Sequence, residues 1–268
     1  MIIKHDFFIP QLNTNRTIRV YLPPSYERGN RFYSVVYMHD GQNIFDSPDA
    51  FDRPWYVDKL VDKMPIYKQT IVVGIDNGGI SRIDEYAPFK NKKQGGKGEK
   101  YMRFIVETLK PFIDKEYRTF PSPEHTWLIG SSLGGLITYY GGLLYPNVFG
   151  KIGILSPAFW FNPKIMDFNP TLPLNNNRFY VVGSKTESAE MDQTLQKTYW
   201  RLKALNIPDE RLTVISRDSG GHNEAFWNRE FKKMYEVFYG AQPSIINAQP
   251  SVINAQPSII KTIIKKTK

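Results

Sequence analysis

Short apolar runs rich in β-branched residues recur along the chain, and they constrain its fold more than any other feature. They lie at residues 17–22, 33–38, 70–75, 126–130, 151–155, 178–183 and 211–216. Most of the later runs lack the alternation of polar and apolar residues that marks a half-exposed strand, as Ile71-Val72-Val73 illustrates. Continuous apolar runs of this kind are typical of strands buried on both faces of a parallel sheet.

Segments with helical periodicity lie between these runs, at residues 55–64, 101–117, 133–145, 190–205 and 223–239. Pro111 predicts a kink or a break in the second of them. Strands that alternate with helices predict an α/β fold, in which helices flank both faces of a mostly parallel central sheet. No helix separates the run at 17–22 from the one at 33–38, so we expect the first run to pair antiparallel at the sheet edge.

The composition restricts the class of protein. The 268 residues include no cysteine, which excludes disulfides, thiolate metal sites and cysteine nucleophiles and favours a cytoplasmic location. The first residues show no signal-peptide pattern, and no stretch approaches the ~18 consecutive apolar residues of a membrane span. We therefore expect a cytoplasmic protein without a membrane span.

The net charge of +9 comes partly from the end of the chain. Without the lysines of residues 241–268, 31 basic residues face 26 acidic ones, which leaves a net charge of +5. Nucleic-acid-binding proteins usually concentrate basic residues on one face, so this mild excess does not predict a nucleic-acid partner.

Residues 241–268 differ in kind from the rest of the chain. They hold three near-identical heptads of the form Ala-Gln-Pro-Ser-Ile-Ile-Asn and end in a lysine-rich tip. A proline in every heptad excludes a coiled coil. We expect a folded domain over residues 1–240 and a low-complexity basic tail over residues 241–268.

A possible nucleophile lies in Gly130-Ser131-Ser132-Leu133-Gly134, between an expected strand and an expected helix. In a Gly-x-Ser-x-Gly pattern at such a junction, the serine sits on a sharp turn with its hydroxyl exposed above the sheet. The N-terminus of the following helix also favours a negative charge that develops there. We therefore predict that Ser132 is the nucleophile of a hydrolase and that Ser131 has a neighbouring structural role.

A serine nucleophile needs a general base, and the chain has four histidines. Hydrolases with this strand–turn–helix arrangement keep the chain order serine, acid, histidine. His5, His39 and His125 all precede Ser132, whereas His222 follows it with room for an acid between them. His222 is therefore the predicted base.

The acid is expected in the loop after the strand at 178–183, which offers Glu187, Glu190 and Asp192. Glu187 is nearest to the end of the strand. Glu190 and Asp192 fall in the first turn of the next helix, where acidic residues complement the helix dipole. We predict that Glu187 orients the imidazole and stabilises its charged form, and we keep the other two as alternatives.

An oxyanion hole needs two hydrogen-bond donors aimed at the developing negative charge. The backbone N–H of Leu133, directly after the nucleophile, is expected to supply one of them. The other is expected from the loop after residues 33–38, and Gly41 and Gln42 are the candidates.

These motifs together resemble the putative-esterase family, which includes enterochelin esterases, esterase D, and carbohydrate acetyl and feruloyl esterases. The resemblance covers residues 7–239. Besides Glu187 and the Gly221-His222 pair, it rests on His39-Asp40-Gly41-Gln42-Asn43-Ile44-Phe45-Asp46, Val73-Gly74-Ile75-Asp76-Asn77, Arg82-x-Asp84-Glu85-Tyr86, Gly130-Ser131-Ser132-Leu133-Gly134-Gly135-Leu136, Tyr145-Pro146 to Phe149, and Ser156-Pro157-Ala158-Phe159-Trp160.

The resemblance implies an α/β-hydrolase catalytic domain that cleaves carboxylic esters through a Ser–acid–His triad, with no cofactor and no metal. It favours Gln42 over Gly41 as the oxyanion donor. The family's acid loop often reads Gly-x-Lys-Glu, whereas Gly183-Ser184-Lys185-Thr186-Glu187 contains one additional residue.

The substrate class is open at this level: the ester is one of a small molecule or of a carbohydrate. Gly41, Phe159 and Trp160 are candidate substrate-lining residues because they follow strands next to the nucleophile. Two other functions are compatible with the sequence, an acyltransferase on the same scaffold and a binding module without catalytic activity. The sequence does not address the oligomeric state.

Overall fold

The structure, a computed structural model, describes residues 1–46, 50 and 53–240. An eight-stranded sheet with the order β1-β2-β4-β3-β5-β6-β7-β8 forms its centre. The strands are β1 (Ile2–Ile9), β2 (Thr14–Tyr21), β3 (Val35–His39), β4 (Ile71–Ile75), β5 (Thr126–Ser131), β6 (Lys151–Leu155), β7 (Arg178–Ser184) and β8 (Leu212–Arg217). Neighbouring strands from β4 to β8 run parallel, whereas β2 pairs antiparallel with both β1 and β4. The expected α/β fold is confirmed.

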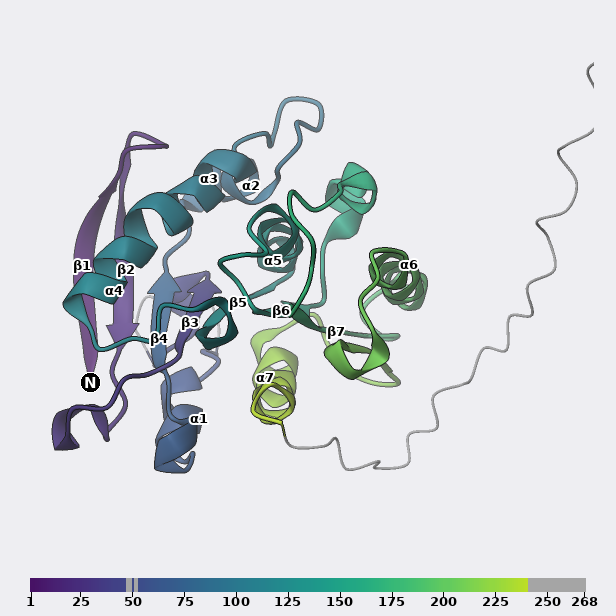
Figure 1. Cartoon of the computed structure of the whole chain (residues 1–268). Coiled ribbons are helices and arrows are strands. Elements are labelled where there is room, and N and C mark those ends of the chain that lie inside the picture. Colours follow the sequence, from purple (N-terminus) through teal and green to yellow (C-terminus); the bar gives the residue numbers. More distant parts are fainter. Residues whose placement is uncertain (47–49, 51–52, 241–268) are drawn as a thin grey trace, which may run out of the picture.

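Helices cover both faces of this sheet (Figure 1). They are α1 (Val57–Asp62), α2 (Arg82–Tyr86), α3 (Gly98–Phe104), α4 (Lys110–Glu116), α5 (Leu133–Leu144), α6 (Met191–Ala204) and α7 (Glu224–Phe238). The core on one face includes residues of α3 to α6, and the core on the other includes residues of α1 and α7.

The two cores explain why the strand sequences lack alternation. Along β3, Val35 and Tyr37 join the core beneath α3 to α6, whereas Val36 and Met38 join the core beneath α1 and α7. Successive strand residues point to opposite faces, so a strand covered on both faces needs apolar residues at every position.

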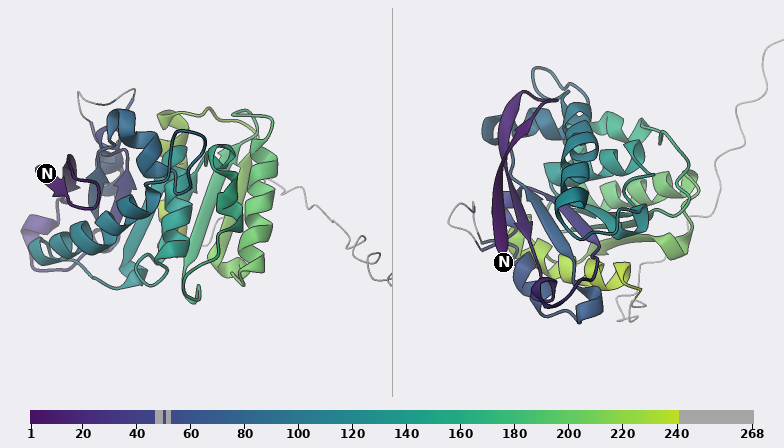
Figure 2. Two further views of the ribbon diagram at one scale, coloured as in Figure 1. Left: turned by 90° about the horizontal axis from the view of Figure 1, so that it is seen from above. Right: turned by 60° about the vertical axis from the view of Figure 1, so that its left-hand side comes forward.

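The N-terminal edge differs from the expectation. The run at 17–22 does pair antiparallel, as part of β2, but it is not at the edge, because β1 lies outside it (Figure 2). The inward positions of β1 include His5, whose Nε2 lies 2.7 Å from the hydroxyl of Tyr117. An edge strand is predicted from apolar residues on its inward face and polar residues on its outward face. In β1, His5 lies on the inward face and the apolar Ile2 and Phe8 are exposed on the outward face, so this alternation is interrupted.

The helical segment at 101–117 continues through Pro111 without the predicted break. A π-helical segment, η5 (Ile105–Leu109), joins α3 to α4, and Pro111 occupies the first turn of α4. Proline lacks a backbone N–H and clashes with the preceding turn of a regular α-helix. The wider π turn before Pro111 accommodates both effects while Leu109 and Ile113 stay in the core.

Residues 241–268, for which a low-complexity tail is predicted, lie outside the described residues. Within the described ranges, none of the helices combines the length and the apolar character needed to cross a bilayer.

His39, the last residue of β3, makes the stability sensitive to acid. It is 3% exposed, its Nδ1 lies 2.9 Å from the Tyr101 hydroxyl, and burial lowers its pKa from 6.5 to about 3. Between these two values the unfolded chain binds a proton that the folded protein excludes, so stability falls as the pH drops below 6.5. The loss attributable to His39 is about 1.4 kcal/mol per pH unit.

Denaturant unfolding between about pH 6.5 and pH 5 measures this loss. His39→Asn keeps a hydrogen-bonding group at the position of Nδ1 but does not titrate in this range. The wild type is expected to lose about 2 kcal/mol more than the variant over that interval. Parallel stability curves for the two proteins would exclude this role of His39.

Candidate active site

Ser132 stands on a sharp turn between β5 and α5. Its φ of 57° and ψ of −123° lie in a region that side-chain-bearing residues rarely adopt. The turn is fixed on both sides, because the Ser132 backbone N–H donates to Leu155 and its carbonyl accepts from Ala158. A Cβ at Gly130 would lie 2.4 Å from the Gly134 carbonyl oxygen, so only glycine permits this approach of strand and helix.

His222 lies in the loop between β8 and α7, and its imidazole reaches the turn of Ser132. Its Nε2 is 2.9 Å from Ser132 Oγ, and its side chain is 44% exposed. One edge of the ring meets the indole of Trp227 at a centroid distance of 5.2 Å and an interplanar angle of 84°. The imidazole is therefore held by packing on one side and open to solvent on the other.

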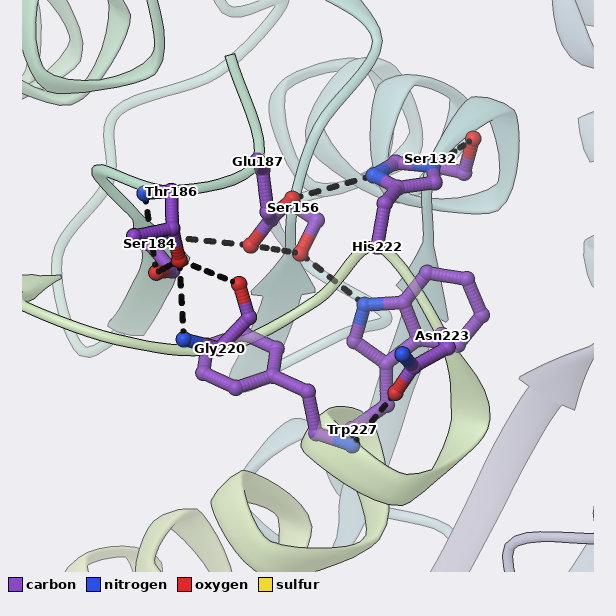
Figure 3. A network of polar contacts seen from close by, with 10 residues as sticks. Ser132, Ser156, Ser184, Thr186, Glu187, Gly220, His222, Asn223 and Trp227 are labelled. Atoms are coloured by element: carbon purple, nitrogen blue, oxygen red, sulfur yellow. Dashed lines mark hydrogen bonds and ion pairs between the residues drawn. The ribbon is translucent and has the colours of Figure 1, made fainter.

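Glu187 lies in the loop after β7, on the far side of the imidazole from Ser132 (Figure 3). Its Oε2 is 3.0 Å from His222 Nδ1, and its side chain is only 1% exposed. Because a carboxylate only accepts hydrogen bonds, this contact assigns the proton to Nδ1 and leaves Nε2 free to accept one from Ser132.

The two alternative acids are placed differently. Glu190 is the N-cap residue of α6, and Asp192 lies in the first turn of that helix. The carboxylate of Asp192 accepts a hydrogen bond from Gln196, one helical turn further along. Of these three acids, Glu187 alone has a carboxylate that contacts His222.

The additional residue of the acid loop, Thr186, links that loop to the one that carries His222. Its hydroxyl donates to the Gly220 carbonyl at 2.7 Å and accepts from the Gly220 N–H at 3.0 Å. A second link joins the Lys185 ammonium to Asp218 at 2.7 Å. These contacts join the loop that carries Glu187 to the loop that carries His222.

The turn after β3 approaches the start of α5. Asp40 has a left-handed backbone (φ 56°), and its carboxylate accepts two hydrogen bonds from Arg82, at 2.6 and 2.8 Å. A Cβ at Gly134, in the first turn of α5, would lie 3.3 Å from the same carboxylate. The Arg82–Asp40 pair therefore holds this turn beside the N-terminus of α5.

Gly41 and Gln42 continue the same turn. A Cβ at Gly41 would lie 2.6 Å from the Gly74 carbonyl carbon, so the close approach to β4 requires glycine. The Gln42 side chain accepts a hydrogen bond from the Asn77 N–H at 3.1 Å. Leu133 is the first residue of α5, and the first N–H groups of a helix have no partner within it. The turn of Gly41 and Gln42 thus approaches the start of α5 through Asp40, and a role of Leu133 and Gln42 as oxyanion donors stays a prediction.

The sequence model of the family described as "Putative esterase" matches residues 9–238. The chain belongs to this family. Membership makes it a carboxylic-ester hydrolase, the activity class that the sequence motifs predict.

Individual relatives agree with this membership. The esterase is 25% identical over 250 residues to the uncharacterized protein YbbA of Bacillus subtilis, which covers 87% of this chain and 96% of that protein. It is 24% identical over 237 residues to the ferri-bacillibactin esterase BesA of the same organism, which covers 78% and 81%. The crystal structure of the BES protein from Bacillus cereus superposes with a TM-score of 0.73 at 18% identity, over 88% of this chain and 94% of that one. This last similarity shows a common fold.

The candidate substrate-lining residues of the esterase have unlike surroundings. Phe159 is buried and packs against the ring of Tyr139 at a centroid distance of 5.1 Å, which makes it part of the core. Trp160 is 77% exposed, and Gly41 is buried against β4. Contact of any of these three with a substrate stays a prediction.

Ser156 and Arg82 lie in the family motifs, but the motifs alone predict no role for either residue. The structure places the Ser156 hydroxyl on the carboxylate of Glu187 and Arg82 on the turn after β3. Ser156 is 31 residues from Glu187 and Arg82 is 42 residues from Asp40, so no local sequence pattern indicates either contact. No cluster of three or more His, Asp and Glu side chains in the described part of the chain is arranged to hold a metal ion.

Proposed function

We propose that the protein is a serine esterase that cleaves carboxylic esters of small molecules, with Ser132 as nucleophile, His222 as general base and acid, and Glu187 as the orienting acid. The observation that carries the proposal is the line of contacts from Ser132 Oγ to His222 Nε2 at 2.9 Å and from Nδ1 to Glu187 at 3.0 Å. A nucleophile within hydrogen-bond reach of a base, itself oriented by a third group, is the arrangement that activates a serine.

In the first half of the reaction, Ser132 Oγ attacks the ester carbonyl carbon while His222 Nε2 takes the hydroxyl proton. Glu187 stabilises the resulting imidazolium through Nδ1. The tetrahedral intermediate then collapses, the carbon–oxygen bond to the alcohol breaks, and His222 returns its proton to the leaving alcohol. An acyl group remains on Ser132.

In the second half, a water molecule takes the place of the alcohol. His222 accepts a proton from this water, which attacks the acyl carbon, and Ser132 leaves with the proton that His222 returns. The exposure of the imidazole, 44%, is consistent with access by both water and substrate.

The oxyanion of each tetrahedral intermediate needs donors that are already in place. We assign these to the backbone N–H groups of Leu133, the first residue of α5, and of Gln42, in the turn after β3. The positive end of the α5 dipole adds to the stabilisation of the negative charge. The ion pair of Arg82 and Asp40 supports the assignment, since it fixes the turn that carries Gln42.

Pre-steady-state kinetics test the acyl-enzyme step. With p-nitrophenyl acetate in excess, p-nitrophenol is expected to appear in a burst equal to the enzyme concentration, followed by slower steady turnover. Added methanol should divert part of the acyl group to methyl acetate without changing the burst. A linear time course from the first turnover, with no methyl ester formed, would argue against acylation of the enzyme.

A further inference from the structure

Ser156 is a buried residue at the end of β6 that none of the steps above uses. It is fully inaccessible to solvent, and its φ of 45° is in the left-handed region. Its backbone N–H donates to the Val182 carbonyl in β7 at 2.7 Å. A buried polar residue held in an unfavourable backbone conformation is a candidate for a specific function.

The Ser156 hydroxyl lies between Trp227 and Glu187 (Figure 3). It is 2.9 Å from the indole Nε1 of Trp227 and 2.9 Å from Oε1 of Glu187. An indole N–H can only donate and a carboxylate can only accept, so the hydroxyl must accept from Trp227 and donate to Glu187. The direction of both hydrogen bonds is therefore determined by chemistry.

The carboxylate of Glu187 depends on such donors because it is almost wholly buried. Its Oε1 accepts from the Ser156 hydroxyl and from the Ser184 N–H, both at 2.9 Å, which leaves Oε2 to face His222. A buried carboxylate is stable in its charged form only when its oxygens receive hydrogen bonds. The two donors on Oε1 also fix the rotation of the carboxylate plane.

Trp227 also contacts His222, the hydrogen-bond partner of Glu187. It lies in the first turn of α7, is 7% exposed, and meets the imidazole of His222 edge to face. One indole thus supports His222 by direct contact and Glu187 through Ser156.

We propose that Ser156 and Trp227 are positioning residues for the esterase reaction, which hold Glu187 and His222 in the geometry that the base requires. This inference rests on the proposed triad. The two residues extend it into a continuous chain of hydrogen bonds, from Trp227 through Ser156 and Glu187 to His222.

Ser156→Ala and Trp227→Phe test the proposal. Loss of a hydrogen bond to a charged group is expected to lower kcat for p-nitrophenyl acetate roughly 10- to 100-fold in Ser156→Ala, and less in Trp227→Phe, which keeps the Ser156 hydroxyl. KM should stay within about 2-fold, because neither residue is assigned a contact with the substrate. The downfield proton resonance of His222 Nδ1–H, observed by proton NMR, should shift or broaden in both variants.

Two matched controls remove the same groups where they have no partner. Among the described residues, the buried hydroxyl of Ser216 and the buried indole nitrogen of Trp127 make no hydrogen bond. Ser216→Ala and Trp127→Phe should therefore keep kcat within about 3-fold and leave the resonance at its wild-type position. Should Ser156→Ala fail to fold, as judged by thermal unfolding, Trp227→Phe carries the test.

Two results would overturn the proposal: an unchanged resonance in a folded Ser156→Ala or Trp227→Phe protein, or losses of kcat no larger than those of the controls. The NMR readout also separates this proposal from the function it rests on. A shifted resonance in these variants, together with full activity of Ser132→Ala, would retain the positioning role and reject Ser132 as the nucleophile.

Discussion

Ser132→Ala is expected to lower kcat/KM for p-nitrophenyl acetate by at least about 1,000-fold, since loss of a triad serine in other hydrolases removes nearly all catalysis except that of substrate binding and the oxyanion hole. The replacement removes only the hydroxyl. Alanine at φ 57° carries the same backbone strain as serine, so the unfolding midpoint should change little. The loss of activity is thus expected in a protein that folds normally.

Ser131→Ala is the matched control for this variant. Ser131 is the last residue of β5, directly before the nucleophile, and it is buried. Its hydroxyl has no role in the proposed chemistry, so activity should stay within about 3-fold of the wild type. Wild-type turnover by Ser132→Ala, or an equal loss in both variants, would contradict the assignment of the nucleophile.

Glu187→Gln is expected to lower kcat by about 10,000-fold or somewhat less, as removal of the orienting acid does in serine proteases. The replacement keeps the size of the side chain, but its amide group can donate a hydrogen bond to His222 Nδ1. That donation stabilises the tautomer that carries its proton on Nε2, and an imidazole in this form cannot accept the proton of Ser132. Steady-state kinetics with the same ester measure the effect.

Glu190→Gln and Asp192→Asn show whether the loss is specific to the assigned acid. Glu190 occupies the N-cap position of α6 without a side-chain capping hydrogen bond, and Asp192 accepts from Gln196, so each variant is expected to keep activity within about 3-fold. A large loss in one of these variants, with Glu187→Gln still active, would transfer the role of the acid to that residue.

Much of this architecture can be predicted from the sequence because its causes are local. Continuous apolar runs such as Ile71-Val72-Val73 reflect burial on both faces of the sheet, and the glycines around Ser132 reflect a turn that excludes a Cβ. The order of Ser132, Glu187 and His222 follows from the order of the strands. These features depend on neighbouring residues or on topology, so they leave a pattern in the chain.

Other features depend on contacts between distant segments and leave no such pattern. The sequence does not predict the edge strand β1, because His5 lies among its inward residues, where its hydrogen bond with Tyr117 compensates for its polarity. Trp227 and Ser156 are 71 residues apart, and their contact arises only when α7 packs against β6 and β7. Thr186 appears in the sequence as an insertion, whereas in the fold it joins two loops through Gly220.

The most direct test of the account is to label the protein with a fluorophosphonate, which reacts with an activated serine hydroxyl, and to locate the adduct by peptide mass spectrometry. We predict one adduct per chain, on Ser132 in the wild type, and no labelling of Ser132→Ala. An adduct on another serine, or equal labelling of Ser132→Ala, would contradict the claim that His222 and Glu187 activate Ser132.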